Sequence, residues 1–377
     1  MSLREEQVKF IRENFSLFNQ TLRELAVIPA PSHHEEKRVE YCTKFLENAG
    51  AKGVYTDEAL NVLYPYRCED TEEIFVLCAH TDVVFPDTDT LPLSVSDGKI
   101  YCPGVGDDTA NVVALLMAAK YIAKNKITPQ DCTLLLVVNS GEEGLGNLKG
   151  SRKIIDDFGD RIKEFITFDG YAYTVTNRAV GSKRFLVEIE TEGGHSYSKF
   201  GNRNAIHILS SLVCDLYNVQ VPEKGRTTYN VGTVSGGTSV NTIAQHAEML
   251  YEFRSDERDS LEYMQKEFDN IIELYRENGV DVKVTLVGDR PCSGEVDPLT
   301  NEALAARSAA AVKKYYGYDV SFGSGSTDCN IPLSRGIVSA CVGCVTGGGA
   351  HTREEYVNIE SLLPGIRVAF DMILSHF

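Results

Sequence analysis

The chain has 377 residues, of which 43% are hydrophobic, and it carries a formal net charge of -17 at pH 7. This length predicts about two domains. The negative charge argues against nucleic-acid binding, because phosphate recognition needs a basic surface. No apolar run approaches the ~18 residues of a membrane span, and the charged start lacks the apolar block of a signal peptide. We therefore expect a globular, cytoplasmic protein.

Cysteine usage agrees with a reducing compartment. The ten cysteines are scattered, and several lie inside apolar runs, which is typical of buried reduced thiols. Cys341 and Cys344 have the spacing of a redox pair. Because they lie within the apolar run 337–345 and not at the start of a helix, we interpret them as core residues.

Strand and helix patterns alternate through the first half of the chain. This alternation predicts a mostly parallel sheet sandwiched by helices, in which ligands bind at the carboxyl ends of the strands. We expect helices over 4–28, 34–49, 112–124 and 151–158, and strands over 74–79, 133–138 and 165–168.

Between residues 181 and 291 the strands become amphipathic and two helices are interleaved with them. The order is strand, helix, strand, strand, helix, strand, which is that of a ferredoxin-like α+β unit. A helix over 300–316 and an apolar strand over 337–345 then resume the α/β pattern of the first half. We therefore predict one domain of residues 1–180 and 292–377, interrupted by an inserted domain of residues 181–291.

Acidic and histidine side chains follow several of the strand-like runs. His80 and Asp82 follow the first strand, and Glu142 and Glu143 follow the apolar run 134–138. Adjacent carboxylates repel each other, so these two glutamates require a counter-charge. Further candidates stand in a glycine-rich turn, after the strand over 165–168 and in a late glycine-rich loop: Asp107, Asp108, Asp169 and His351.

Taken singly, each of these motifs has a simpler explanation. His80 and Asp82 could form an ordinary hydrogen-bonded pair at a strand end. Asp107 or Asp108 could cap the helix that follows. The two adjacent glutamates could be solvated loop acids. Their combination instead favours a cation site.

A charge count favours a pair of zinc ions used for hydrolysis. Two zinc ions bring four positive charges, which three carboxylates and one hydroxide balance, and two neutral imidazoles complete the coordination. Cobalt and manganese suit the same mixed donors. One carboxylate then remains free as a base, which is Glu142, and the predicted ligands are His80, Asp107, Glu143, Asp169 and His351.

These segments resemble an ordered series of five motifs in the M20 family of dizinc metallopeptidases and deacylases, and Ala30–Glu35 resembles the start of its peptidase T-like members. The resemblance spans nearly the whole chain. It implies a fold of the zinc exopeptidase type, in which residues 181–291 serve as a lid and dimerisation domain. The five segments are Leu77–Asp82, Gly106–Ala110, Ser140–Gly144, Thr167–Gly170 and Gly349–Thr352.

The resemblance also implies how the ligands divide. Asp107 would bridge both metals and be followed by a cis peptide bond. His80 and Asp169 would complete one site, and Glu143 and His351 the other.

Catalytic roles follow from the same resemblance. Glu142 would take a proton from the bridging water and deliver it to the leaving amine, and Asp82 would orient His80. His195 resembles the family's lid histidine, which stabilises the oxyanion in its own or a partner subunit. A histidine in a surface turn is the alternative.

Substrate contacts are implied at four further positions. Arg254 suits a substrate carboxylate, although an exposed strand arginine is the alternative. The loop 323–328 would line the substrate pocket with backbone amides, or else is a flexible turn. The four candidates are Asn241, Arg254, Gly325 and Ser326. The chain departs from the family at Thr109 and Asn111, where lysine and glycine are usual.

We therefore expect a dizinc exopeptidase, an amino- or tripeptidase, that acts on small peptides and has the capacity to form a homodimer through its lid. A deacylase of N-acyl amino acids or succinyl amides uses the same chemistry on another bond. A metal-free binding protein on the same fold is the alternative from another class.

Overall fold

The structure, a computed structural model, describes residues 3–69, 72–130 and 133–377. The chain forms two compact units, which we call unit 1 (Met1–Ala179 with Gly294–Phe377) and unit 2 (Val180–Ser293). Unit 1 is an α/β fold, and unit 2 contains a separate antiparallel sheet. The fold class predicted from the sequence is therefore confirmed.

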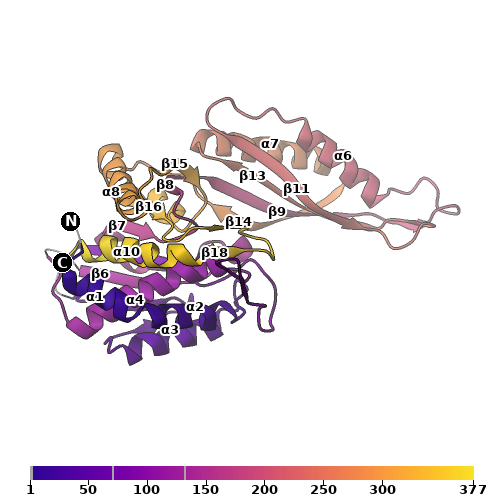
Figure 1. The fold of residues 1–377 in the computed structure, drawn as a ribbon. Helices are drawn as coiled ribbons and strands as arrows, with labels where there is room; N and C mark the ends of the chain where they lie inside the picture. The colour runs from indigo at the N-terminus through magenta and orange to yellow at the C-terminus, as the bar shows by residue number, and fades with distance from the viewer. Residues whose placement is uncertain (1–2, 70–71, 131–132) are drawn as a thin grey trace. The chain divides into compact units, whose positions relative to one another are not determined.

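Unit 1 is built on an eight-stranded mixed sheet of order β1-β2-β6-β3-β7-β16-β8-β15. Figure 1 labels β6, β7, β16, β8 and β15 of this sheet. The pairs from β6 through β3 and β7 to β16 are parallel, as is the pair of β15 with β8. The central strands β3 and β6 are buried at nearly every position, as expected for strands covered on both faces. The strands are Tyr55–Thr56 (β1), Val62–Tyr66 (β2), Ile74–His80 (β3), Thr133–Asn139 (β6), Ile162–Thr167 (β7), Thr174–Ala179 (β8), Ser321–Gly325 (β15) and Val338–Val342 (β16).

Helices cover both faces of this sheet. Leu77 and Leu136 point into a core shared with α1, α2, α3, α4, α8 and α10, whereas Val76 and Leu135 point into a core with α5 and α9. The alternation follows from the two-residue period of a strand. The helices are Glu5–Glu13 (α1), Phe15–Ala26 (α2), Glu36–Asn48 (α3), Ala110–Asn125 (α4), Lys149–Phe158 (α5), Pro298–Tyr316 (α8), Asn330–Ser334 (α9) and Ile359–Leu374 (α10).

Some elements differ from the sequence prediction. The helix expected over 4–28 is two helices, because Asn14 leaves the helical conformation and its side chain donates to the carbonyl oxygen of Phe10 at 2.9 Å. Strands β2, β8 and β15 and helix α10 were not predicted. Pro65 and Pro364 interrupt the patterns of β2 and α10, and β8 is rich in polar residues.

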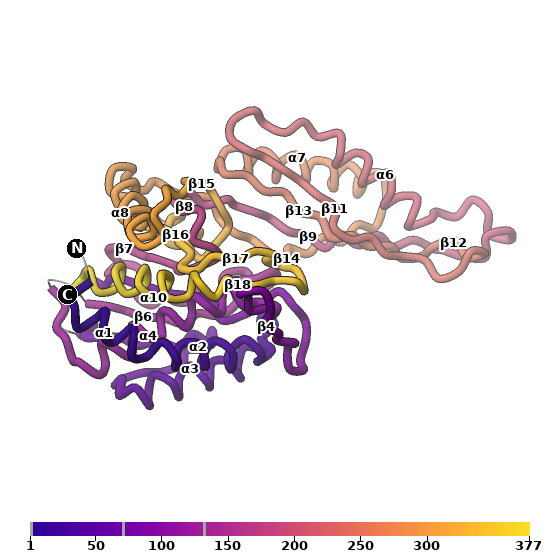
Figure 2. Tube along the Cα trace, in the orientation of Figure 1, coloured from indigo at the N-terminus to yellow at the C-terminus, as the bar shows by residue number. Residues whose placement is uncertain are grey.

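The two ends of the described chain lie together in unit 1. Figure 2 shows the start of α1 near the end of α10, and Arg4 donates from Nη2 to the main-chain oxygen of Phe377 at 3.2 Å. Phe10, Tyr121 and Phe370 form an aromatic cluster in which Phe10 lies 5.0 Å from Tyr121 between ring centroids. This packing anchors α4, the helix that begins directly after Asp107–Thr109.

Unit 2 has the element order predicted for a ferredoxin-like unit. Its sheet has the order β11-β13-β9-β14 and is antiparallel throughout. Aromatic residues from its strands pack against α7, and Phe185 stacks on Phe268 at 4.4 Å between ring centroids. The elements are Gly181–Glu190 (β9), Ala205–Tyr217 (α6), Thr227–Gly236 (β11), His246–Ser255 (β13), Arg258–Glu277 (α7) and Asp281–Arg290 (β14).

The described cysteines are free thiols, and all but Cys214 are buried. Cys132 lies outside the described residues. Cys344 is fully buried, in keeping with its interpretation as a core residue. Within the described ranges, no helix has both the length and the apolar character needed to cross a bilayer. The cytoplasmic location stays a prediction.

Candidate metal centre

Four of the predicted site residues lie at the ends of adjacent parallel strands. His80 ends β3, Glu142 and Glu143 follow β6, and Asp169 follows β7. Because β6, β3 and β7 are parallel neighbours, their carboxyl ends meet at one edge of the sheet. His80 is fully buried there, and the two glutamates are each 5% exposed.

A second, smaller sheet of order β17-β18-β5-β4 brings Asp107 and His351 together. His351 lies in the loop between β17 and β18, and β5 leads toward the loop that holds Asp107. Since β18 pairs with β5, the two loops are neighbours. A cis peptide bond joins Asp107 to Asp108, as the family resemblance implied. The strands are Gly347–Gly348 (β17), Tyr356–Asn358 (β18), Lys99–Tyr101 (β5) and Ser94–Ser96 (β4).

The two carboxylate oxygens of Asp107 face two different imidazoles. Oδ1 lies 3.0 Å from Nε2 of His80, and Oδ2 lies 3.3 Å from Nε2 of His351. Each imidazole also faces a second carboxylate. Nε2 of His80 lies 3.8 Å from Oδ1 of Asp169, and Nε2 of His351 lies 3.2 Å from Oε1 of Glu143. Two donor sets therefore share Asp107.

Asp108 and Glu142 also come within reach of these donors. Asp108, however, is engaged elsewhere. Its Oδ2 accepts the main-chain amide of His80 at 3.0 Å, and its Oδ1 accepts the side-chain amide of Asn111 at 2.5 Å. Glu142 forms a further group of possible donors with His80 and Glu143, and it belongs to neither of the two sets that share Asp107.

The centre concentrates negative charge in a buried place. Burial first, and then the charge of Asp107, raises the pKa of Asp169 well above its usual range. Burial also raises the pKa of Glu143 to about 7, although His351 opposes the shift by a hydrogen bond. Hydrogen bonds to Asp107 and Glu143 raise the pKa of His351 to about 10. The electrostatics are those of a cation site.

The donor set fits two divalent cations. Oxygen and nitrogen donors within 4.8 Å of one another form the groups His80–Asp107–Asp169 and Asp107–Glu143–His351, the first of which also includes Asp108. Mixed carboxylate and imidazole donors suit zinc, manganese and cobalt. No such group of three or more ligating side chains with cysteine occurs among the described residues.

The carboxylate of Asp82 has more partners than the sequence suggested. Nδ1 of His80 lies 3.1 Å from the main-chain oxygen of Asp82 and 3.5 Å from its Oδ1. The carboxylate also accepts the main-chain amides of Glu142 and Glu143, at 3.0 and 2.9 Å, and the hydroxyl of Ser32 at 2.7 Å. Asp82 thus holds the loop after β6 as well as facing the imidazole.

Glu355 was not singled out in the sequence, although it holds the loop of Asp107. Its carboxylate is 1% exposed and accepts the main-chain amides of Gly104, Gly106 and Asp107 at 2.7 to 2.8 Å. The glutamate three residues after a predicted ligand loop looks like a surface residue in sequence. Only the fold shows that it is buried.

Asn111, one of the departures from the family, ties two ligand loops together. Besides Asp108, its side-chain amide donates to the carbonyl oxygen of Gly170 at 2.9 Å, next to Asp169. Its Oδ1 accepts the main-chain amide of Cys344 at 2.8 Å.

The predicted residues His195, Asn241 and Arg254 belong to unit 2. His195 is exposed, lies in β10 (Gly194–His195) and accepts the main-chain amide of Tyr197 at its Nδ1. The main-chain oxygen of Asn241 accepts the amide of Ser196 at 2.9 Å, so Asn241 lies beside the histidine. Arg254 lies on β13 and binds Glu252 through Nε and Nη2, at 2.9 and 3.0 Å.

Gly325 and Ser326 require a correction of the predicted loop over 323–328. Residues Ser321–Gly325 form the edge strand β15, because they pair in parallel with β8, where Gly325 lies opposite Ala179. The loop proper therefore begins at Ser326. Beyond it, Asp328 is fully buried and accepts the side-chain amide of Asn139 at 2.5 Å.

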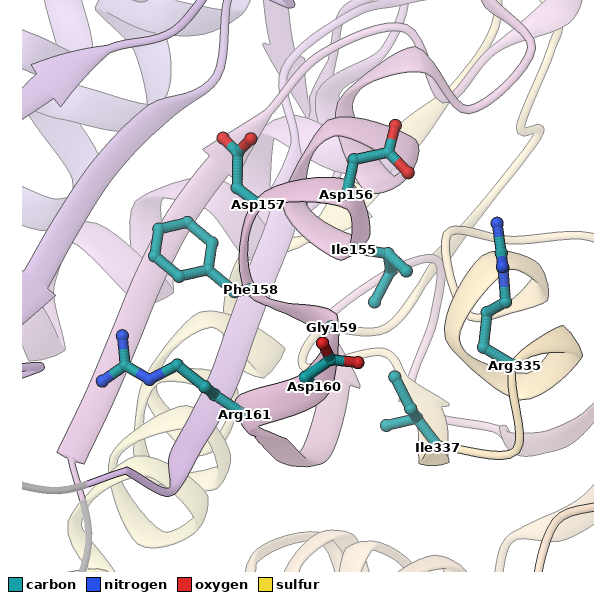
Figure 3. Close-up of a pocket in the computed structure, with 9 residues that line it drawn as sticks. All are labelled: Ile155, Asp156, Asp157, Phe158, Gly159, Asp160, Arg161, Arg335 and Ile337. Carbon is teal, nitrogen blue, oxygen red and sulfur yellow. The ribbon is translucent and has the colours of Figure 1, made fainter.

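A separate hollow of about 590 Å³ lies around the end of α5 and the segment 335–337 (Figure 3). Ile155 and Ile337 line it together with charged residues of both signs, such as Asp156 and Arg335. It contains no predicted site residue. The candidate metal centre therefore lies outside this hollow.

The sequence profile of peptidase family M20/M25/M40 matches residues 76–375. A succinyl-diaminopimelate desuccinylase from Corynebacterium glutamicum is 23% identical over 354 residues, which cover 90% of this chain and 91% of the relative. A peptidase M20 domain-containing protein from Schizosaccharomyces pombe is 28% identical over 193 residues. That match covers 49% of this chain and only 46% of the yeast protein.

Solved structures agree with the fold. A tripeptidase from Staphylococcus aureus has a TM-score of 0.74 at 22% identity, covering 96% of this chain and 98% of its own. The aminopeptidase PepT from Bacillus cereus has a TM-score of 0.69 at 21% identity, covering 94% and 97%. At such identities the likeness establishes the fold alone.

Proposed function

Since the chain belongs to peptidase family M20/M25/M40, we propose that it cleaves short peptides as a metal-dependent exopeptidase of the amino- or tripeptidase type. The observation that carries the proposal is the placement of Asp107. Its two oxygens face His80 and His351, one each. A carboxylate placed in this way suits a bridging ligand of a two-metal hydrolytic site.

In this proposal Asp107 would be shared by two divalent cations, zinc in the first instance. His80 and Asp169 would hold one of them, and Glu143 and His351 would hold the other. The contacts of these side chains with one another and the burial of His80 and Glu143 support the assignment. The raised pKa values of Asp169 and Glu143 support it as well, because a cation offsets the repulsion between buried carboxylates.

When bound, the two cations polarise the scissile carbonyl and lower the pKa of the attacking water. The chain supplies the proton transfers. We assign Glu142 as the base that takes the proton of the water and passes it to the leaving amine. Its position beside His80 and Glu143 supports this role. Asp82 acts indirectly, because it fixes the backbone of the loop that carries Glu142.

Unit 2 is assigned the role of a lid and of the surface through which a homodimer would form. His195 would stabilise the oxyanion in its own or the partner subunit, and Arg254 would bind a substrate carboxylate. Asn241 lies beside the histidine, which supports a shared role in gripping the substrate. The backbone of Gly325 and Ser326 would line the substrate pocket.

A deacylase of N-acyl or succinyl amino acids is the second candidate. The match to the Corynebacterium desuccinylase covers most of both chains, which favours it. Both candidates hydrolyse an amide bond by the same chemistry, so the metal centre does not separate them. A metal-free binding protein is disfavoured because all five predicted ligand positions carry ligating side chains.

A substrate panel on metal-loaded protein tests the proposal. Dipeptides and tripeptides are compared with acetyl- and succinyl-amino acids under identical metal content. The peptidase proposal expects kcat/KM for at least one peptide to exceed that for every acyl-amino acid. The reverse order would assign the deacylase activity. If neither the peptides nor the acyl-amino acids are hydrolysed, the metal-free binding protein remains as the explanation.

A further inference from the structure

Arg38, on helix α3, is a fully buried cation directly behind the metal centre. Its guanidinium donates four hydrogen bonds. Nε donates to the main-chain oxygen of Ile28 at 2.8 Å, and Nη2 donates to that of Ala26 at 3.3 Å. Nη1 donates to the main-chain oxygen of Thr81 and to the hydroxyl of Thr109, both at 3.0 Å.

All four acceptors of Arg38 are uncharged oxygens. Across the described ranges, no carboxylate lies within ion-pair distance of its guanidinium. Burying a charge that has no oppositely charged group within ion-pair distance is costly, so neighbouring groups must compensate it. Burial lowers the pKa of Arg38 to about 10, and the neighbours that oppose the shift are, in order of size, Cys102, Cys42, Asp82 and Glu355. The two carboxylates among them are those that hold the ligand loops.

One bond of Arg38 fixes the strand end that carries His80. Thr81 stands between His80 and Asp82, and its carbonyl oxygen accepts from Nη1. On its other side, the amide of Thr81 donates to the main-chain oxygen of Asn139 at 2.8 Å, at the end of β6. The two peptide units that meet at Thr81, next to the ligand, are therefore each held by one hydrogen bond.

The other bond from Nη1 fixes the loop that carries Asp107. The hydroxyl of Thr109 accepts from Arg38 and donates to the main-chain oxygen of Gly104 at 2.5 Å. Thr109 thereby closes the loop from Gly104 to the start of α4. Glu355 holds the same loop through three main-chain amides, so a buried cation and a buried carboxylate both bind it.

We propose that Arg38 is a positioning residue of the metal centre, which sets the spacing between His80 and Asp107 by binding Thr81 and Thr109 through a single nitrogen. The inference rests on the proposed metal-dependent function. A purely structural role is the competing explanation, because any buried arginine with four hydrogen bonds stabilises a fold. If Arg38 is a positioning residue, a variant that still folds loses metal affinity. If its role is purely structural, such a variant keeps its metal affinity.

Thr109→Val is the sharpest variant, since it removes one hydroxyl, with its bonds to Arg38 and to Gly104, and leaves three of the four bonds of Arg38 in place. Thr109→Ser restores the hydroxyl. Thr43→Val is the matched control, because Thr43 lies on the same helix as Arg38 and its hydroxyl has no hydrogen-bond partner among the described residues. Arg38→Lys keeps the charge but lacks the planar fork that reaches several acceptors at once.

Each full-length protein is freed of metal and titrated with Co²⁺, and the visible absorption of Co²⁺, its dissociation constants and the melting temperature of the metal-free protein are recorded. We expect Thr109→Val and Arg38→Lys to lose about 10- to 100-fold in Co²⁺ affinity, with a changed spectrum. Thr109→Ser and Thr43→Val should match the wild type.

The outcomes separate the two proposals. If the wild type binds two Co²⁺ ions and Thr109→Val binds them with the same affinity and spectrum, Arg38 only stabilises the fold and this inference is overturned. That conclusion holds even if Arg38→Lys fails to fold. If the wild type binds no Co²⁺, the proposed function fails, and the inference fails with it.

Discussion

The main-chain amide of Glu142 donates to Oδ1 of Asp82 at 3.0 Å. This bond joins the proposed base to the residue that lies two positions after His80, across two neighbouring strands. Burial opposes the charge of Asp82, yet hydrogen bonds with His80 and Ser32 lower its pKa to about 2. Asp82 is therefore an anion at neutral pH that organises the loop after β6 as well as the imidazole.

Asp82→Asn should weaken metal binding and turnover together, by about 10- to 100-fold. The asparagine has the same size, but its NH₂ group replaces one of the two carboxylate oxygens, so one of the main-chain amides of Glu142 and Glu143, which bind different oxygens of Asp82, loses its acceptor. Metal affinity and kcat measured on the same preparation check this. Asp319→Asn is the control, since Asp319 pairs with Lys313 at the surface. Unchanged affinity in Asp82→Asn would show that the loop is held by other contacts.

Glu142→Ala should keep its bound metal and lose ~10²-fold or more in kcat, because only the proton transfer is removed. Metal content and turnover are measured side by side, with the exposed Glu302→Ala as the control for removing a glutamate. Retained turnover in Glu142→Ala would assign the proton transfer to another group. Loss of metal would instead place Glu142 among the ligands.

The histidine next to the carboxyl terminus predicts a pH dependence of stability that is independent of the metal centre. Burial, with the charge of Arg307 second, lowers the pKa of His376 to about 4, and its ring lies 4.6 Å from that of Phe75. In the unfolded chain the imidazole of His376 binds a proton below its usual pKa of about 6.5. In the folded state the imidazole stays neutral until the pH falls to about 4.

The free energy of unfolding of the wild type should therefore fall as the pH drops from about 6.5 to about 4, by about 3 kcal/mol from this group. His376→Phe should lack this component. Chemical denaturation of both proteins across that pH range gives the difference, in which the other titrating groups cancel. If the free energies of unfolding of the wild type and of His376→Phe differ by the same amount at every pH, the burial of a neutral imidazole at His376 is contradicted.

Much of the α/β architecture could be predicted, because its central strands are long apolar runs. The strand that ends at His80 and the run before Glu142 are buried on both faces. Such strands can be recognised from the sequence alone, because they are continuous apolar runs. The elements that were missed are short, polar or interrupted by proline. Strand β15 looked like a flexible loop, since apart from Phe322 its residues are serine and glycine and it forms only by pairing with β8.

The residues that face the proposed cations could be identified from sequence, because carboxylates and histidines stand out after apolar strands. The residues that hold them could not. Arg38 and Glu355 look like ordinary surface charges on a helix and in a loop, and only the fold buries them. Thr109 and Asn111 were noted as departures, but their hydrogen bonds depend on main-chain oxygens that sequence does not place.

The central claim, that Asp107 is shared by two cations, is tested most directly by the metal content of purified, metal-saturated protein measured by mass spectrometry. The wild type should hold about two divalent ions per chain, His351→Ala about one and Asp107→Ala essentially none. Circular dichroism should confirm that each variant is folded. A wild type without bound metal, or an Asp107→Ala protein that still holds two ions, would contradict the claim.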